Sequence, residues 1–151
     1  MSALLPVRAL LAGVASGCRS QSGVAAVVLT PAGTGRLDRL LHKPGRFWGA
    51  VVPVVGESLG DKSPKAPART DFPVILARLG FGAAAAAALA SRRGESQPLA
   101  AALGAAGALA SSYGGVQARA ALAARAGSDL PGAVGEDLLA LGLGLTAARL
   151  P

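Results

Sequence analysis

Six ionisable side chains interrupt otherwise apolar stretches of this 151-residue sequence, and they are the groups best able to do chemistry. Three are basic and three acidic: Arg19, Arg78, Arg119, Glu57, Glu136 and Asp137. An ionisable group at the centre of a bilayer costs on the order of 3 kcal/mol, so it faces a partner or water. Asp61 follows Glu57 by four residues and shares its face in a helix. These seven residues form the predicted buried polar network.

The equal numbers of the two signs favour ion pairs between different segments. We expect Arg19 to pair with Glu136 or Asp137, and Arg119 to pair with Glu57.

Two interpretations of this network stay open. In the first, the charges line a polar pathway and bind an ion, a proton or an anionic substrate. In the second, they form structural ion pairs that fix helix register, or they extend toward lipid headgroups. Arg78 and Arg119 are the two that could reach a headgroup region.

Motifs of the common enzyme classes are absent. The sequence has no phosphate-binding P-loop, no dinucleotide fingerprint and no HExxH motif. A single cysteine, Cys18, excludes an intrachain disulfide and a cysteine-rich metal site. The single histidine, His42, lies in a polar connection, where we expect a solvated side chain. We therefore expect a protein that is not an enzyme, with no catalytic residue, no metal and no cofactor.

The composition indicates a membrane protein. Hydrophobic residues make up 52% of the chain, charged residues 15% and aromatic residues 3%, whereas a soluble domain usually carries about 25% charge. The apolar residues are mostly small, which suits helices that pack closely in lipid. The alternative is a soluble alanine-rich helical bundle, because alanine is a strong helix former but only weakly hydrophobic.

Polar clusters divide the chain into five apolar stretches. They are Leu4 to Leu29, Phe47 to Gly60, Phe72 to Ala90, Pro98 to Ala124, and Leu130 to Leu150. Four approach the roughly 20 residues that a helix needs to cross a membrane. The second is short and contains Pro53, so it spans the membrane or forms a re-entrant segment. We expect an all-α compact bundle of four to five membrane segments in a single domain, 1–151.

The connections between these stretches carry helix-start signals. "RTDFP" offers Thr70 and Asp71 as caps with Pro73 in the first turn, and "GSDLP" repeats the pattern before the last stretch. Residues 30–46 hold several glycines and prolines, which predict a polar surface loop with at most one amphipathic turn around Leu37 to Leu41.

The net charge of +7 raises the question of a nucleic-acid partner. The basic residues are scattered between apolar stretches without stacking aromatics, which favours anchoring loops of a membrane protein and no nucleic-acid binding. With five spans, one side of the membrane would carry most of them, and that side would be cytoplasmic. It would hold Arg36, Arg39, Lys43, Arg46, Arg92, Arg93 and Arg149, against Lys62, Lys65, Arg69 and Arg125 on the other side.

Small residues at four-residue spacing predict close helix packing. They are Gly13 with Gly17, Gly56 with Gly60, and Gly107 with Ser111 and Gly115. "PVVGESL" also resembles "PGAVGEDL" near residue 131, so the chain is interpreted either as two related halves or as a chance similarity.

Cys18 poses a separate question, because "ASGC" resembles the acylation site of an exported lipoprotein. Arg8 lies inside the apolar run rather than before it, and "GVAAVVLT" after the cysteine is apolar rather than a polar tether. These departures favour a membrane helix in which Arg19 is buried.

Five motifs carry a resemblance to a known family. They are "GCRSQSG", "GESLGDKSPKAPARTDFP", "LARLGFGAAAAAALA", "GGVQARAALAAR" and "LPGAVGEDLLALG". Their order and spacing, from Gly13 to Leu145, resemble a small bacterial integral-membrane family known as domain of unknown function 4126. The resemblance implies a helical protein of the bacterial inner membrane and no established reaction.

The sequence thus favours a multi-pass membrane protein that is transporter- or channel-like. The first alternative is a structural or assembly protein of the membrane that transports nothing, and the second is an exported lipoprotein acylated at Cys18. The expected partner is the lipid bilayer, with a homo-oligomer left open and the substrate unassigned.

Overall fold

The computed structural model describes residues 3–46, 48–49, 52, 71–128 and 130–151. These residues form helices and no strand, which confirms the all-α class. The helices are α1 (Leu5–Cys18), α2 (Ser22–Val28), α3 (Arg36–Leu41), α5 (Phe72–Arg92), α6 (Gln97–Ala126) and α7 (Leu130–Arg149).

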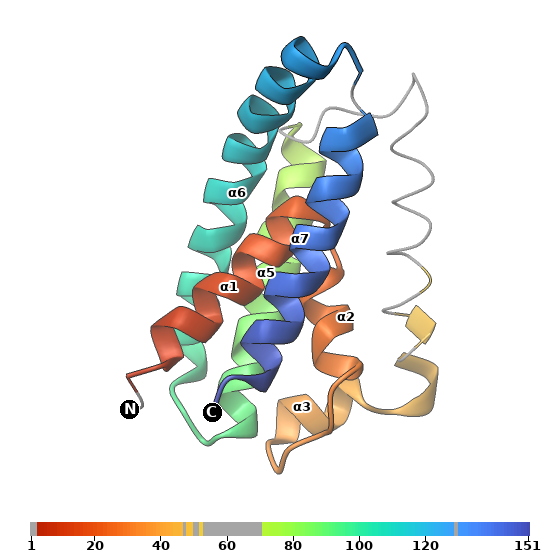
Figure 1. The fold of residues 1–151 in the computed structure, drawn as a ribbon. Coiled ribbons are helices and arrows are strands. Elements are labelled where there is room, and N and C mark those ends of the chain that lie inside the picture. The colour runs from red at the N-terminus through yellow and green to blue at the C-terminus, as the bar shows by residue number, and fades with distance from the viewer. Residues whose placement is uncertain (1–2, 47, 50–51, 53–70, 129) are drawn as a thin grey trace.

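Three long helices, α5, α6 and α7, run along the length of the bundle (Figure 1). The turn between α5 and α6 lies at one end, together with α3 and the last residues of α7. We call this the basic end, because these elements and the residues next to them carry Arg36, Arg39, Lys43, Arg92, Arg93 and Arg149. The turn between α6 and α7 lies at the opposite end, which we call the far end.

The first apolar stretch, expected to be one membrane-spanning helix, forms a helical hairpin instead. α1 rises from the basic end to the middle of the bundle, stops at Cys18, and α2 returns to the basic end (Figure 1). Arg19 is buried as expected, but it has extended backbone angles and lies at the break rather than within a helix.

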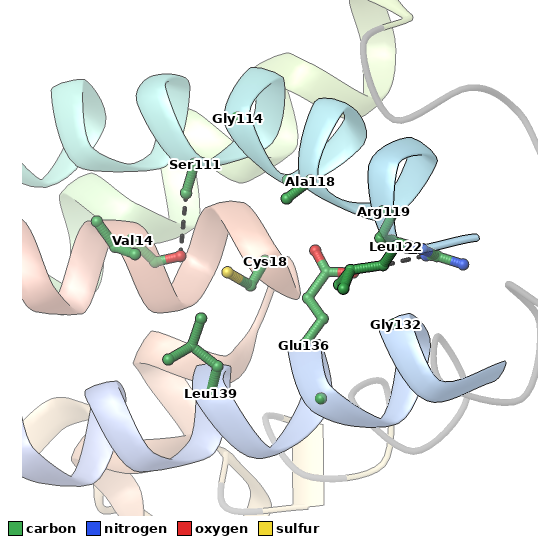
Figure 2. Close-up of a pocket in the computed structure, with 12 residues that line it drawn as sticks. Val14, Cys18, Ser111, Gly114, Ala118, Arg119, Leu122, Gly132, Glu136 and Leu139 are labelled. Carbon is green, nitrogen blue, oxygen red and sulfur yellow. Dashed lines mark hydrogen bonds and ion pairs between the residues drawn. The ribbon is translucent and has the colours of Figure 1, made fainter. Parts of the chain in front are cut away.

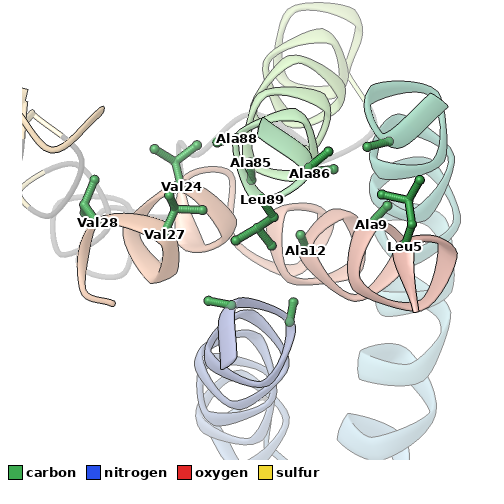
Figure 3. Packing of buried hydrophobic residues seen from close by; sticks show 14 residues of the cluster. Leu5, Ala9, Ala12, Val24, Val27, Val28, Ala85, Ala86, Ala88 and Leu89 are labelled. Atoms are coloured by element: carbon green, nitrogen blue, oxygen red, sulfur yellow. The ribbon is translucent and has the colours of Figure 1, made fainter. Parts of the chain in front are cut away.

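Local sequence and close packing explain this break. Glycine and serine residues cluster around the apex, and these residues are weak helix formers. A Cβ atom on Gly23 of α2 would lie 2.4 Å from the Ser16 hydroxyl and 2.7 Å from the Ala12 carbonyl of α1. Glycine at this position therefore lets α2 fold back against α1. Figure 3 shows Leu89 of α5 among the side chains of this hairpin, in the core of the bundle.

Large and small side chains are distributed in an unusual way in α6 and α7. Apart from Glu136, every buried residue in the two helices is small: Ala100, Gly104, Gly107, Ala108, Ser112, Gly132, Ala140, Gly144, Ala147 and Ala148. Ten large apolar residues of the same helices are exposed: Leu99, Leu109, Tyr113, Val116, Leu122, Leu130, Val134, Leu138, Leu139 and Leu141. Soluble proteins bury leucine and valine preferentially, so this arrangement is the reverse of an aqueous core.

Two of the described helices, α5 and α6, are long and apolar enough to cross a membrane. The sequence predicts four or five such segments. α1 has only 14 residues, and Glu136 and Asp137 lower the mean hydropathy of α7. The stretch from Phe47 to Gly60 lies largely outside the described residues.

The helix-start signal before α5 is confirmed in position. α5 begins at Phe72 directly after Asp71, with proline in its first turn, but the Asp71 side chain makes no capping hydrogen bond. α7 begins at Leu130, one residue before Pro131, as the second signal predicts.

The segment 30–46 is more ordered than the surface loop expected from its composition. It contains α3, at the position of the expected amphipathic turn, and Asp38 of this helix is fully buried. Arg92 of α5 contacts the Asp38 carboxylate at 2.8 Å. His42, expected to be solvated, is half-buried, with its two ring nitrogens 2.9 Å from the carbonyl oxygens of Asp38 and Thr30. The ion pair between the buried Asp38 carboxylate and Arg92 thus links α3 to α5.

Candidate functional site

The apex of the α1–α2 hairpin meets charged residues of two long helices at mid-height in the bundle. Arg78 of α5 is fully buried. It donates hydrogen bonds to the carbonyl oxygens of Gly17 and Cys18, and the bond to the Cys18 oxygen is 3.3 Å long. Carbonyl groups at a helix C-terminus carry partial negative charge and lack partners within the helix, so a cation is favourable there. Arg78 therefore stabilises the end of α1, and this buried position does not fit the alternative in which it extends toward lipid headgroups.

Removing this guanidinium tests its role. We expect Arg78→Met to lower the free energy of unfolding by about 2–3 kcal/mol, because hydrogen bonds from a charged donor contribute about 1.5–3 kcal/mol. Arg36→Met removes an exposed arginine of α3, and we expect a change within about 0.5 kcal/mol. Circular dichroism during denaturation of the purified protein measures both. Equal effects of the two substitutions would contradict the capping role.

Arg19 forms an ion pair with Asp137 of α7 through its Nε atom. The pairing of Arg19 with an acidic residue of the last apolar stretch is therefore present in the structure. The Arg19 side chain is 3% exposed and that of Asp137 is 38% exposed, so one partner is buried and the other lies at the edge of the bundle. This contact joins the hairpin apex to α7.

A cavity of about 340 Å³ lies beyond the end of α1, between α6 and α7 (Figure 2). Its walls are mostly apolar and small, with Val14, Leu122 and Leu139 as the larger contributors. Four residues of the wall have polar or ionisable side chains and come from three helices: Cys18, Ser111, Arg119 and Glu136. The volume falls at the lower limit of small-molecule sites, which have volumes of about 300–1,000 Å³.

Arg119 and Glu136 form an ion pair at the wall of this cavity. Arg119 Nη1 of α6 lies 3.5 Å from Glu136 Oε2 of α7, with side chains that are 19% and 7% exposed. Figure 2 shows the Glu136 carboxylate pointing from α7 toward α6. A Cβ atom on Gly115 would lie 3.2 Å from Glu136 Oε1, so the glycine leaves room for the carboxylate. The two charges therefore attract each other, and both residues belong to the wall of the cavity.

The structure brings together five of the seven residues of the predicted network. Arg19 meets Asp137, Arg119 meets Glu136, and Arg78 meets the end of α1. Two residues of the network and two of the small residues predicted for helix packing lie outside the described residues, so the pairing of Arg119 with Glu57 and the interpretation as two halves stay predictions. These positions are Glu57, Asp61, Gly56 and Gly60.

The small residues predicted for helix packing lie at contacts of α6. A Cβ atom on Gly13 would lie 2.1 Å from the Gly104 carbonyl, and one on Gly107 would lie 2.7 Å from the Leu10 carbonyl. Gly17 lies against Ala108, and the Ser111 hydroxyl donates a 3.0 Å hydrogen bond to the Val14 carbonyl.

Three features of the structure were not predicted from the sequence. One is the ladder of Gly132, Glu136, Ala140, Gly144 and Ala148 in α7, which a search at four-residue spacing would have found. Glu136 points inward because it lies on the same face of α7 as these small buried residues. The other two are ion pairs at the basic end, Arg8 with Glu95 and Arg92 with Asp38. These two pairs join residues far apart in the sequence and have no local signal.

Comparisons with known proteins give no family assignment. No protein-family model, curated protein or solved structure matches the chain. We therefore infer the function from the geometry of the hairpin apex and the cavity.

Proposed function

We propose that this chain is a multi-pass protein of a bacterial inner membrane, related to the family named above, that binds a small solute in the cavity and passes it across the bilayer. The exposed leucine and valine side chains of α6 and α7 support the membrane placement, because large exposed apolar surfaces mark contact with lipid or with another protein. Close packing of small residues is typical of membrane helices.

The observation that carries the transport proposal is the hairpin whose charged apex lies at mid-height beside the cavity. A helix that stops inside a bilayer leaves backbone groups without partners, so such breaks occur where the protein buries them or where they line a cavity. Broken helices with binding sites near the midplane are typical of transporters. Here Arg78 binds the carbonyl groups at the break, and Arg119 with Glu136 supplies both charges in the adjacent cavity.

A structural or assembly role remains the alternative, and the closely packed α1, α5 and α6 are compatible with it. The lipoprotein alternative receives less support, because Cys18 is buried at the apex and its neighbour Arg19 is paired with α7.

Flux through reconstituted vesicles tests the proposal with protons, potassium and chloride as probes. We expect the protein to raise the permeability of the vesicles to at least one probe. Arg119→Ala and Glu136→Gln should each lower this flux by about tenfold or more, which corresponds to about 1.4 kcal/mol. Arg125→Ala is the matched control, since it removes an exposed arginine from the last turn of the same helix. We expect it to leave the flux unchanged.

Cys18 provides an independent reporter, because it is the single cysteine of the chain and lines the cavity. A methanethiosulfonate small enough to enter the cavity reaches this thiol from inside the bundle, so it should block the flux of the wild type and leave that of Cys18→Ser unaffected. Wild-type vesicles no more permeable than protein-free ones would remove the transport proposal in favour of the structural role. Equal loss in the Arg119 and Arg125 variants would remove the assignment to this cavity.

A further inference from the structure

Positive charge is concentrated at the basic end of the bundle. Eight basic residues of the described chain lie on the elements at this end or contact them: Arg8, Arg36, Arg39, Lys43, Arg46, Arg92, Arg93 and Arg149. The far end holds Arg125 and Asp71 among the described residues, one charge of each sign. Within the part of the chain that the structure describes, the two ends therefore differ strongly in net charge.

The acidic groups at the basic end are already occupied. Glu95 is paired with Arg8, and Asp38 is paired with Arg92, so these two carboxylates neutralise two of the eight cations. Partial burial, and then repulsion from the nearby Arg8 and Arg92, lower the pKa of the Arg93 guanidinium.

Four of the six remaining cations lie on α3 and in the turn after it. Arg36, Arg39, Lys43 and Arg46 are all exposed, and none has an acidic partner among the described residues. We call these four residues the basic patch. Since like charges repel one another, a cluster of four within eleven residues is favourable when an anionic partner neutralises it.

Trp48 points to the kind of partner. It is the single tryptophan of the chain, it follows the basic patch by two residues, and its side chain is 64% exposed. An exposed indole next to cations is typical of the boundary between lipid tails and headgroups. A single-stranded nucleic acid would instead call for several aromatic side chains on which bases stack. Clusters of four or more basic residues beside a membrane segment bind anionic lipids.

We infer that the basic patch and Trp48 form a binding surface for the headgroups of anionic phospholipids in one leaflet. This inference depends on the membrane placement proposed above and does not depend on transport. It also assigns the basic end to the cytoplasmic leaflet, because positively charged connections lie predominantly on that side.

Fluorescence of Trp48 tests this surface directly, because a bromine atom on a lipid tail quenches a tryptophan that it contacts. The protein is reconstituted into phosphatidylcholine bilayers that contain a fixed fraction of either brominated phosphatidylglycerol or brominated phosphatidylcholine. We expect stronger quenching by the brominated phosphatidylglycerol. In the triple variant Arg36→Gln, Arg39→Gln and Lys43→Gln, that preference should fall by roughly 100-fold, since each cation near an anionic surface contributes about fivefold.

Two controls sharpen the experiment. Arg36→Lys with Arg39→Lys keeps the charge and should keep the preference, whereas Arg125→Gln removes a cation from the far end and should not change it. Equal quenching of the wild-type protein by the two lipids, or a preference that survives the triple substitution, would overturn the lipid site. Absence of quenching by either lipid would overturn the membrane placement as well, and an acidic protein or a nucleic acid would then be the partner to test.

Discussion

Gly104→Leu is expected to abolish the packing of the bundle and to lower the free energy of unfolding by about 3 kcal/mol or more. Gly104 lies where α6 contacts both α1 and α5. A Cβ atom on Gly104 would lie 2.4 Å from the Gly82 carbonyl oxygen, and one on Gly13 of α1 would lie 2.1 Å from the Gly104 carbonyl oxygen. Backbone atoms cannot move aside as a flexible side chain can, so a larger residue pushes both helices away.

Gly114 provides a matched control in the same helix, because an added Cβ atom there meets no other atom within 4 Å. Alanine is a better helix former than glycine by about 1 kcal/mol. Gly114→Ala should therefore stabilise the protein slightly, while Gly104→Ala should destabilise it. Thermal unfolding of the purified variants, followed by circular dichroism, measures both. The same sign for the two alanine variants would show that α1, α5 and α6 do not approach as closely as described.

Asp137→Asn should destabilise the protein by about 2–3 kcal/mol, because it removes the carboxylate that forms an ion pair with the buried Arg19. Breaking a buried ion pair costs about 3–5 kcal/mol, and the partial exposure of Asp137 reduces this figure. A double-mutant cycle with Arg19→Gln isolates the pair, since the double variant should lose less stability than the sum of the single ones.

Glu95→Gln combined with Arg19→Gln is the control cycle, because Glu95 lies at the basic end and pairs with Arg8 instead. The two effects should add within about 0.5 kcal/mol. A coupling between Arg19 and Asp137 no larger than this value would mean that α7 is held at the hairpin apex by packing alone.

The helical class and the boundaries of the long helices follow from the sequence alone. Asp71 and Pro73 mark the start of α5, and Pro131 marks the start of α7, because a helix start depends on residues within one turn. The inward direction of the Glu136 side chain could also be predicted from the sequence, since small residues lie at four-residue spacing on both sides of it. These features are local, so neighbouring residues suffice to predict them.

The reversal at Arg19 was decided by the tertiary structure. The residues before and after the break are equally apolar, so composition cannot distinguish one spanning helix from a hairpin. Arg78 and Asp137 hold the apex, and both are more than fifty residues away in the sequence. The choice between Glu136 and Asp137 as the partner of Arg19 likewise depends on how α7 is rotated against α1. Contacts between distant segments fix that rotation, and no pattern within either segment encodes it.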